Sequence, residues 1–148
     1  MPYTVVIADD VTGANDIGIM YAGAGLDTYV YSFCDGREQD YRQCDVLVVD
    51  TDSRFDTRDT AYRKVYEALK GAPRDGVRQY INKQCSVFRG NIGAEFDAML
   101  DALSEEFAVV VLGFPDNGRT TVDGIHYVFG TPLAESQFAR DPVHPMTK

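Results

Sequence analysis

Short apolar runs alternate with helical patterns along this chain, and that alternation limits the folds open to it. The runs predict strands at residues 5–8, 28–33, 46–50, 77–81 and 107–113, the last being the clearest candidate for a buried strand. Helical spacing of apolar residues lies between them, at residues 12–24, 58–70 and from Asn91 onward. Because parallel neighbours need crossover connections, we predict an α/β fold: an open, mostly parallel sheet with helices on both faces.

Capping residues and glycines suggest where these elements begin and end. Thr12 is available to cap the first helix and Gly25 to end it, and Asp56 or Thr57 can cap the second helix. In the third helix, Phe96, Met99, Leu100 and Leu103 form the predicted buried stripe. Beyond residue 113, glycines at short intervals and the run 125–129 predict an appended β-hairpin near the C-terminus.

The charge balance and the cysteines limit the partners and the compartment. With 14 Lys and Arg against 23 Asp and Glu, the formal charge of −9 opposes binding to nucleic acid or to an anionic membrane. Cys34, Cys44 and Cys85 are odd in number and form no CxxC, so we expect free thiols. The N-terminus lacks the pattern of a secretion signal, and 148 residues suit one domain, which we expect to be cytoplasmic.

Polar loops follow the predicted strands, and they are the best place to look for a site. The loops comprise residues 9–16, 51–54, 83–91 and 114–121. Ligands of open parallel sheets bind outside the carboxyl ends of the strands, so we expect these loops to converge on one edge. Loops are polar in most proteins, but four of this kind together favour a binding site.

Positive side chains in these loops favour a small anion as the ligand. Arg54, Arg89 and Arg119, with Lys83, can bind a carboxylate or a phosphate through charged hydrogen bonds. The alternative is that they pair with nearby aspartates as ordinary surface ion pairs, namely Asp10, Asp52 and Asp116.

Asp9 and Asp10 are the candidates for a base that accepts a proton from a substrate hydroxyl, because they end the first predicted strand. Either could instead cap the next helix, and Asp10 suits that role better. His126 and His144 have no neighbours at zinc-ligand spacing, and the sequence contains no GxxxxGK[ST] motif, so we predict no metal site and no ATP site within it.

Four segments, 7–16, 50–54, 86–95 and 114–124, together resemble the N-terminal domain of the four-carbon acid sugar kinase family. The last segment, continuing to Leu133 and Pro142, is the most specific, and the resemblance covers nearly the whole chain. One departure stands out: the family has an aspartate where this chain has Cys85, within Asn82-Lys83-Gln84-Cys85-Ser86-Val87.

The resemblance implies a domain that binds threonate, erythronate or an oxidised relative. In that family a separate C-terminal domain binds ATP and Mg²⁺, and the terminal hydroxyl of the sugar acid is phosphorylated. We therefore expect residues 1–148 to be a single N-terminal sugar-acid-binding domain without the ATP site. By itself, this domain should not turn over ATP. Asp9 and Asp10 are the catalytic candidates, and the substrate-binding candidates are Asp52, Ser53, Arg54, Lys83, Gln84, Cys85, Ser86, Arg89, Gly90, Asn91, Asn117 and Arg119.

A second hypothesis remains open at this point. The chain could be a non-catalytic relative that binds a small anion, or one that only forms a homodimer through an exposed sheet edge. A screen of four-carbon sugar acids separates these readings, because a ligand of the folded state raises the melting temperature.

Overall fold

The computed structural model describes residues 2–33 and 41–146, and these form two compact units. The first unit comprises residues 1–84 and 91–108, and the second comprises residues 85–90 and 109–148. Cys34 lies outside the described residues, whereas Cys44 and Cys85 are free thiols. Among the described helices, none is long and apolar enough to span a bilayer.

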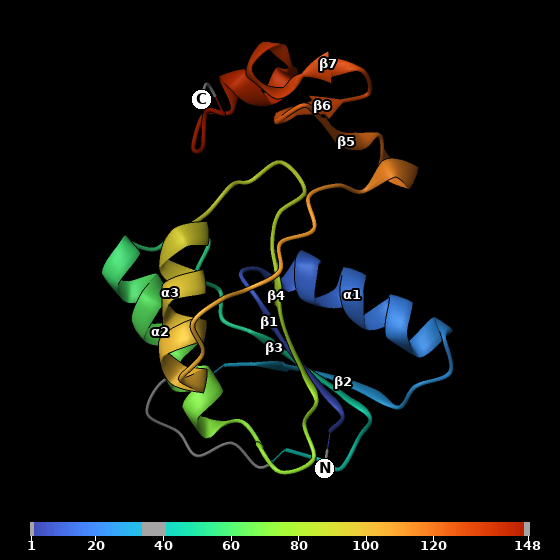
Figure 1. The fold of residues 1–148 in the computed structure, drawn as a ribbon, viewed down its shortest axis with the longest axis vertical. Coiled ribbons are helices and arrows are strands. Elements are labelled where there is room, and N and C mark those ends of the chain that lie inside the picture. Colours follow the sequence, from blue (N-terminus) through green and yellow to red (C-terminus); the bar gives the residue numbers. More distant parts are fainter. Residues whose placement is uncertain (1, 34–40, 147–148) are drawn as a thin grey trace. The chain divides into compact units, whose positions relative to one another are not determined.

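The first unit is a parallel sheet with the strand order β2-β3-β1-β4 (Figure 1). Its elements follow one another along the chain as β1 Thr4–Ala8, α1 Val11–Gly23, β2 Thr28–Ser32, β3 Val46–Asp50, α2 Arg58–Gly71, β4 Gln79–Lys83 and α3 Ile92–Leu103. β1 and β3 pair along their whole length, from Thr4 opposite Val46 to Ala8 opposite Asp50. The open parallel sheet predicted from the alternation of elements is therefore confirmed.

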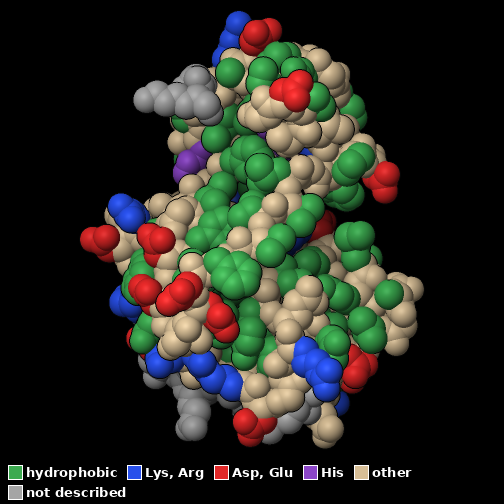
Figure 2. Space-filling view, in the orientation of Figure 1, with side chains coloured by type: hydrophobic (Ala, Val, Ile, Leu, Met, Phe, Trp, Pro, Cys, Tyr) green, Lys and Arg blue, Asp and Glu red, His purple; other side chains and the backbone are tan. Residues whose placement is uncertain are grey.

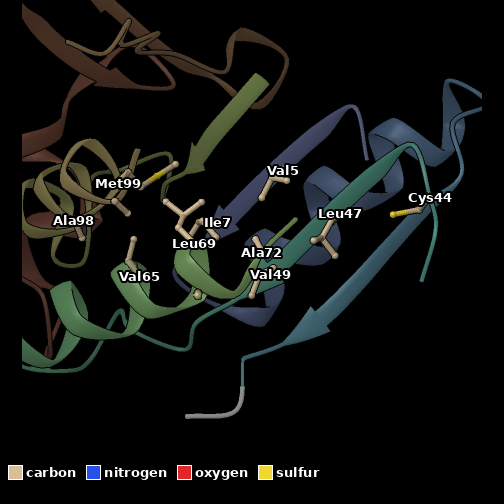
Figure 3. Packing of buried hydrophobic residues seen from close by; sticks show 12 residues of the cluster. Val5, Ile7, Cys44, Leu47, Val49, Val65, Leu69, Ala72, Ala98 and Met99 are labelled. Carbon is tan, nitrogen blue, oxygen red and sulfur yellow. The ribbon is translucent and has the colours of Figure 1, made fainter. Parts of the chain in front are cut away.

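Alternate residues of β1 and β3 point to opposite faces of the sheet, and helices cover both faces. Val5 and Ile7 pack with Val65 and Leu69 of α2 and with Met99 of α3 (Figure 3). The side chains on the other face pack against Ala14, Ile17 and Tyr21 of α1. They belong to Val6 and Ala8 of β1 and to Val46 and Val48 of β3. Strands covered on both sides need apolar residues at every position, which explains the unbroken runs in the sequence.

Two local predictions were wrong. The N-cap of α1 is not Thr12 but Asp10, whose carboxylate accepts a hydrogen bond from Gly13 N at 2.8 Å, which confirms the capping role considered for Asp10 as an alternative. The buried face of α3 consists of three alanines, one glutamate and one methionine, namely Ala94, Glu95, Ala98, Met99 and Ala102. Alanines let α2 approach α3 closely, so the bulkier Phe96, Leu100 and Leu103 lie only partly buried beside that contact.

The prediction of a buried strand at residues 107–113 was also wrong. Among the described residues, none in this segment joins a β-ladder, and Figure 1 draws it as a coil. Phe107 is 76% exposed and Val111 is 87% exposed. An apolar run shows that a segment is hydrophobic, but it does not show whether a neighbouring strand is available to pair with it. In this structure β4 is the edge strand of the sheet. Apolar side chains are accordingly prominent on the face seen in Figure 2.

The second unit contains the predicted hairpin, extended by a third short strand. β5 Arg119–Val122, β6 Ile125–Val128 and β7 Thr131–Pro132 form an antiparallel sheet. Asp123 and Gly124 both have positive φ, as a two-residue turn with the twist of a hairpin requires. A small core of Cys85, Val87, Val128 and Leu133 holds this unit together.

Candidate functional site

The loops after β1 and β3 meet at a buried ion pair. Asp9 is fully buried, and its carboxylate accepts hydrogen bonds from Arg54 Nε and Nη2, both at 2.8 Å. The backbone supports the pair, because Ser53 N and Arg54 N both donate to Asp9 O. Such a bidentate arrangement fixes the orientation of both side chains.

Asp10 contacts the same guanidinium but is more accessible. Its carboxylate is paired with Arg54 Nη1 and caps α1 through Gly13 N, while its side chain keeps 18% exposure against 0% for Asp9. The two adjacent aspartates thus differ in what they can reach. Asp10 can contact a ligand in solution, whereas Asp9 can act only through Arg54.

Lys83 brings a second positive charge to the end of β1. A Cβ built on Gly13 would lie 3.5 Å from Lys83 Nζ and 2.8 Å from Asp10 Oδ1, so the ammonium and the carboxylate flank the same glycine. Lys83 Nζ also donates to Gln84 O at 3.2 Å. Glycine at position 13 therefore leaves open the space between a positive and a negative group.

A buried polar network lies behind these charged residues. Ser53 Oγ lies 2.8 Å from Glu95 Oε1 and 2.9 Å from Thr51 Oγ1. Gln84 Nε2 donates to Glu95 Oε2 at 2.7 Å. Burial raises the pKa of the Glu95 carboxyl above its ordinary value, and the hydrogen bonds from Ser53 and Gln84 oppose that shift.

Asp52 and Asn91 shape the loop after β3. Asp52 has a left-handed backbone with φ 46°, and its N–H donates to Asp50 Oδ1 at 2.9 Å. Burial raises the pKa of Asp50. Asn91 Nδ2 donates to Ser53 O and Asp56 O, at 3.1 and 3.0 Å, so this side chain holds the loop in place.

The second unit contains its own pair of arginines. The guanidinium carbons of Arg89 and Arg119 lie 5.9 and 5.5 Å from the centroid of the Phe138 ring, within the range of cation–π attraction. Arg89 is also paired with Asp141 at 3.4 Å and donates from Nε to Cys85 Sγ at 3.3 Å. Hydrogen bonds from His144 N and Val143 N, followed by Arg89, lower the pKa of Asp141.

Arg119 is buried, and one of its buried nitrogens has no hydrogen-bond partner among the described residues. Nη1 donates to Asn117 O at 2.7 Å, and the ring of Phe129 lies 5.1 Å from its guanidinium carbon. Among the described residues, Nε has no hydrogen-bond partner. Ser86 serves this unit through its carbonyl, which lies 2.9 Å from His126 Nε2, and Gly90 has a φ of 104° that favours glycine.

The structure thus sorts the predicted site residues into two groups. The first unit brings together Asp9, Asp10, Asp52, Ser53, Arg54, Lys83, Gln84 and Asn91. The second unit carries Cys85, Ser86, Arg89, Gly90, Asn117 and Arg119. Arg54 and Arg89 are engaged by aspartates, though Arg54 pairs with Asp9 and Asp10 in a buried contact and not at the surface.

The sequence prediction missed residues in both groups. Glu95, which lies on the buried face of α3, was not among the candidates because a charged side chain within a helix ordinarily faces solvent. Phe138 and Asp141 were missed because only the folded chain brings them to Arg89. Within residues 2–33 and 41–146, no group of three His, Cys, Asp or Glu side chains is placed to hold a metal ion.

Comparison with known proteins identifies the family to which this chain is similar. Residues 4–148 match the family model described as "Sugar-binding N-terminal domain". The chain is 41% identical to D-threonate kinase of Salmonella typhimurium over 143 residues, and 38% identical to D-erythronate kinase of Heliobacterium modesticaldum over 148 residues. These matches cover 96% and 99% of this chain, but only 33% and 34% of the two kinases.

A solved structure from Bordetella bronchiseptica extends the likeness to three dimensions. That protein was solved as a domain-swapped dimer with bound citrate, and it superposes with a TM-score of 0.86 at 36% identity. The match covers 99% of this chain and 38% of the Bordetella chain. The chain therefore belongs to the family of sugar-binding N-terminal domains, which confirms its resemblance to four-carbon acid sugar kinases.

Proposed function

We propose that this chain binds a four-carbon sugar acid and serves as the substrate-binding domain of an ATP-dependent kinase that phosphorylates the terminal hydroxyl. The family match and the names of the related kinases support the reaction class. The observation that carries the proposal is the Asp10 carboxylate, which is held by Arg54 and Gly13 N beside Lys83 and remains partly exposed. The chain spans about a third of the length of those kinases.

The two aspartates have different roles in this proposal. Asp10 accepts a hydrogen bond or a proton from a substrate hydroxyl, since it is the one with an exposed surface. Asp9 and Arg54 position Asp10, because their bidentate pair is buried and Arg54 links both carboxylates. Lys83 supplies the positive charge that a sugar carboxylate requires.

Within the second unit, Arg89 and Arg119 are proposed as a separate set of anion contacts. Arg119 has a buried Nε without a partner among the described residues, and its Phe138 neighbour also contacts Arg89. The citrate bound to the Bordetella relative is a small polycarboxylate, which supports a carboxylate as the ligand. Of the remaining candidates, Cys85 Sγ accepts a hydrogen bond from Arg89 and Asn117 O accepts one from Arg119.

ATP and Mg²⁺ enter the proposal only through the related kinases. Among the described residues no three His, Cys, Asp or Glu side chains cluster to hold a metal ion, and the sequence contains no P-loop motif. The proposed work of this chain is to bind and orient the acceptor, which is a large part of catalysis in phosphoryl transfer.

Calorimetric titration with D-threonate and D-erythronate tests the proposal directly. We expect both acids to bind, and the uncharged polyols threitol and erythritol to bind at least about tenfold more weakly because they lack the carboxylate. Glu67, which is exposed on α2, offers a control variant, since Glu67→Gln should leave the affinity unchanged. Equal affinity for acids and polyols, or no binding of either, would refute the proposal.

Homodimer formation is a second candidate role. The exposed apolar segment 107–114 and the open edge of β4 support it, as does the domain-swapped dimer of the Bordetella relative. Sedimentation equilibrium across a range of protein concentrations would show a dimer mass, and a constant monomer mass would exclude it.

The free thiols Cys44 and Cys85 support the proposal that the chain works in the cytoplasm.

A further inference from the structure

The network around Glu95 contains more oxygen contacts than its hydroxyl groups can supply with hydrogens. Three short contacts run in series: Glu95 Oε1 to Ser53 Oγ at 2.8 Å, Ser53 Oγ to Thr51 Oγ1 at 2.9 Å, and Thr51 Oγ1 to Ala8 O at 2.9 Å. Each contact needs one hydrogen. Ser53 and Thr51 carry one hydroxyl hydrogen each, so one contact lacks its hydrogen if Glu95 is ionised.

The direction of each hydrogen bond follows from the end of the series. Ala8 O is a carbonyl and can only accept, so the Thr51 hydroxyl donates to it. For all three contacts to be hydrogen bonds, the Ser53 hydroxyl has to donate to Thr51 and its oxygen has to accept from Glu95. If Ser53 instead donates to an ionised Glu95, one of the other two contacts has no hydrogen. An ionised carboxylate cannot donate, whereas a protonated carboxyl completes the whole series.

We propose that the folded protein keeps a proton on Glu95, and that this protonated side chain positions Ser53 and Gln84 for the sugar acid. This inference rests on the proposed function for its ligand, but not for the proton. With Oε1 protonated, Oε2 is left as the acceptor for Gln84 Nε2 at 2.7 Å. Glu95 thereby connects the loop after β3 to the loop after β4, and it fixes one candidate residue of each loop.

The surroundings of Glu95 favour the neutral form. Glu95 is fully buried, and burial is the main cause of its raised pKa. The charged groups acting on it are Asp9 at the end of β1, which disfavours ionisation, and Arg54 after β3, which favours it. Arg54 is engaged by Asp9 and Asp10, β4 leads to the neutral Gln84, and α2 packs beside α3 with apolar residues such as Ala61 and Val65.

Ionising Glu95 should weaken ligand binding. The series then has two hydrogens for three contacts, so either the Ser53–Thr51 contact or the Thr51–Ala8 contact is no longer a hydrogen bond. It also adds a negative charge beside Asp9, in a site proposed to hold an anion. We therefore expect the affinity of the wild-type protein for D-erythronate to fall about tenfold as the pH rises and Glu95 ionises.

Glu95→Gln separates the proton from the shape of the side chain. The amide can donate to Ser53 and accept from Gln84, so it mimics the protonated acid without titrating. We expect this variant to keep the affinity that the wild-type protein has while Glu95 is protonated, and to lose the fall in affinity as the pH rises. Glu95→Ala should lose most of the affinity, since nothing then holds Ser53 and Gln84.

The test combines carbon-13 NMR of labelled glutamate carboxyls with calorimetric titration of D-erythronate across pH. One resonance, absent in Glu95→Gln but present in Glu67→Gln, should stay in the protonated position at pH values above the ordinary glutamate pKa of about 4.3. If every glutamate titrates near that value, the inference is wrong whether or not the ligand binds. If Glu95 keeps its proton but no sugar acid binds, the proposed function and the positioning role fail together, while the proton assignment stands.

Discussion

Arg54 holds Asp9 through two parallel hydrogen bonds, Nε to Oδ2 and Nη2 to Oδ1, each 2.8 Å long, with both side chains buried. A third contact joins the same guanidinium to Asp10. One side chain from the loop after β3 therefore orients both carboxylates at the end of β1. That relationship fixes which aspartate can face a ligand.

Arg54→Ala should destabilise the first unit by about 3–5 kcal/mol, because it leaves the Asp9 charge buried without a partner. Urea denaturation monitored by circular dichroism measures the change. Arg58→Ala is the matched control, since Arg58 is 76% exposed in its pair with Asp97 and should change stability by less than about 0.5 kcal/mol. Equal effects of the two variants would show that the Asp9 pair is not buried.

Asp10→Ala should cost about 1 kcal/mol of stability through loss of the α1 cap, whereas Asp10→Asn should cost much less because asparagine caps equally well. Thr12→Ala, at the residue predicted from sequence as the cap, should leave the helix cap intact. Thermal unfolding of the three variants decides between the residues. A larger loss in Thr12→Ala than in Asp10→Ala would contradict the assignment of the cap.

Val111→Ala should change stability by less than about 0.5 kcal/mol, because the side chain is 87% exposed. Val48→Ala, in the middle of β3, removes a fully buried side chain and should cost roughly 2 kcal/mol. If the two substitutions cost the same, segment 107–113 is buried in solution, either in the sheet or against a second copy.

Tyr62 should titrate late. Its hydroxyl donates to Asp101 Oδ2 at 2.6 Å, and that hydrogen bond raises the pKa of Tyr62 to about 12. Ultraviolet titration of the protein, with Tyr62→Phe to identify the signal, measures the value. In Asp101→Asn the carboxylate is gone, and the pKa of Tyr62 should return toward the ordinary value of about 10. An unchanged pKa in that variant would exclude Asp101 as the cause.

Gly118→Ala should disrupt the second unit, because Gly118 has a φ of 65° and a Cβ there would lie 2.3 Å from the Phe129 ring. Gly93→Ala should instead stabilise α3 by up to about 1 kcal/mol, since nothing lies within 4 Å of its Cβ position and alanine favours a helix. Amide hydrogen exchange of β5 and β6 reports on the first variant and exchange of α3 on the second. Normal protection of β5 and β6 in Gly118→Ala would show that the turn tolerates a side chain.

The positions of β1 and β3 could be predicted because burial on both faces requires continuous apolar residues, whereas the less buried β4 lies at Gln79–Lys83 and not at the predicted residues 77–81. That requirement produced the runs at Val5–Ala8 and Val46–Asp50 and the choice of a parallel sheet. The same rule failed at residues 107–113, because an apolar run reveals the need for a partner strand but not whether one is available. The α3 stripe failed similarly, since close helix packing selected the alanines over the larger residues.

By itself, the sequence determined the α/β class, the hairpin, the family and the charged loops, because each depends on local pattern or on a motif of consecutive residues. Only the tertiary structure decided how those loops are used. It paired Arg54 with Asp9, left Asp10 partly exposed, and buried Glu95 between Ser53 and Gln84. The contact between Arg54 and Asp9, for example, joins residues 45 positions apart in the sequence. Their geometry and burial arise only when the strands align in the sheet.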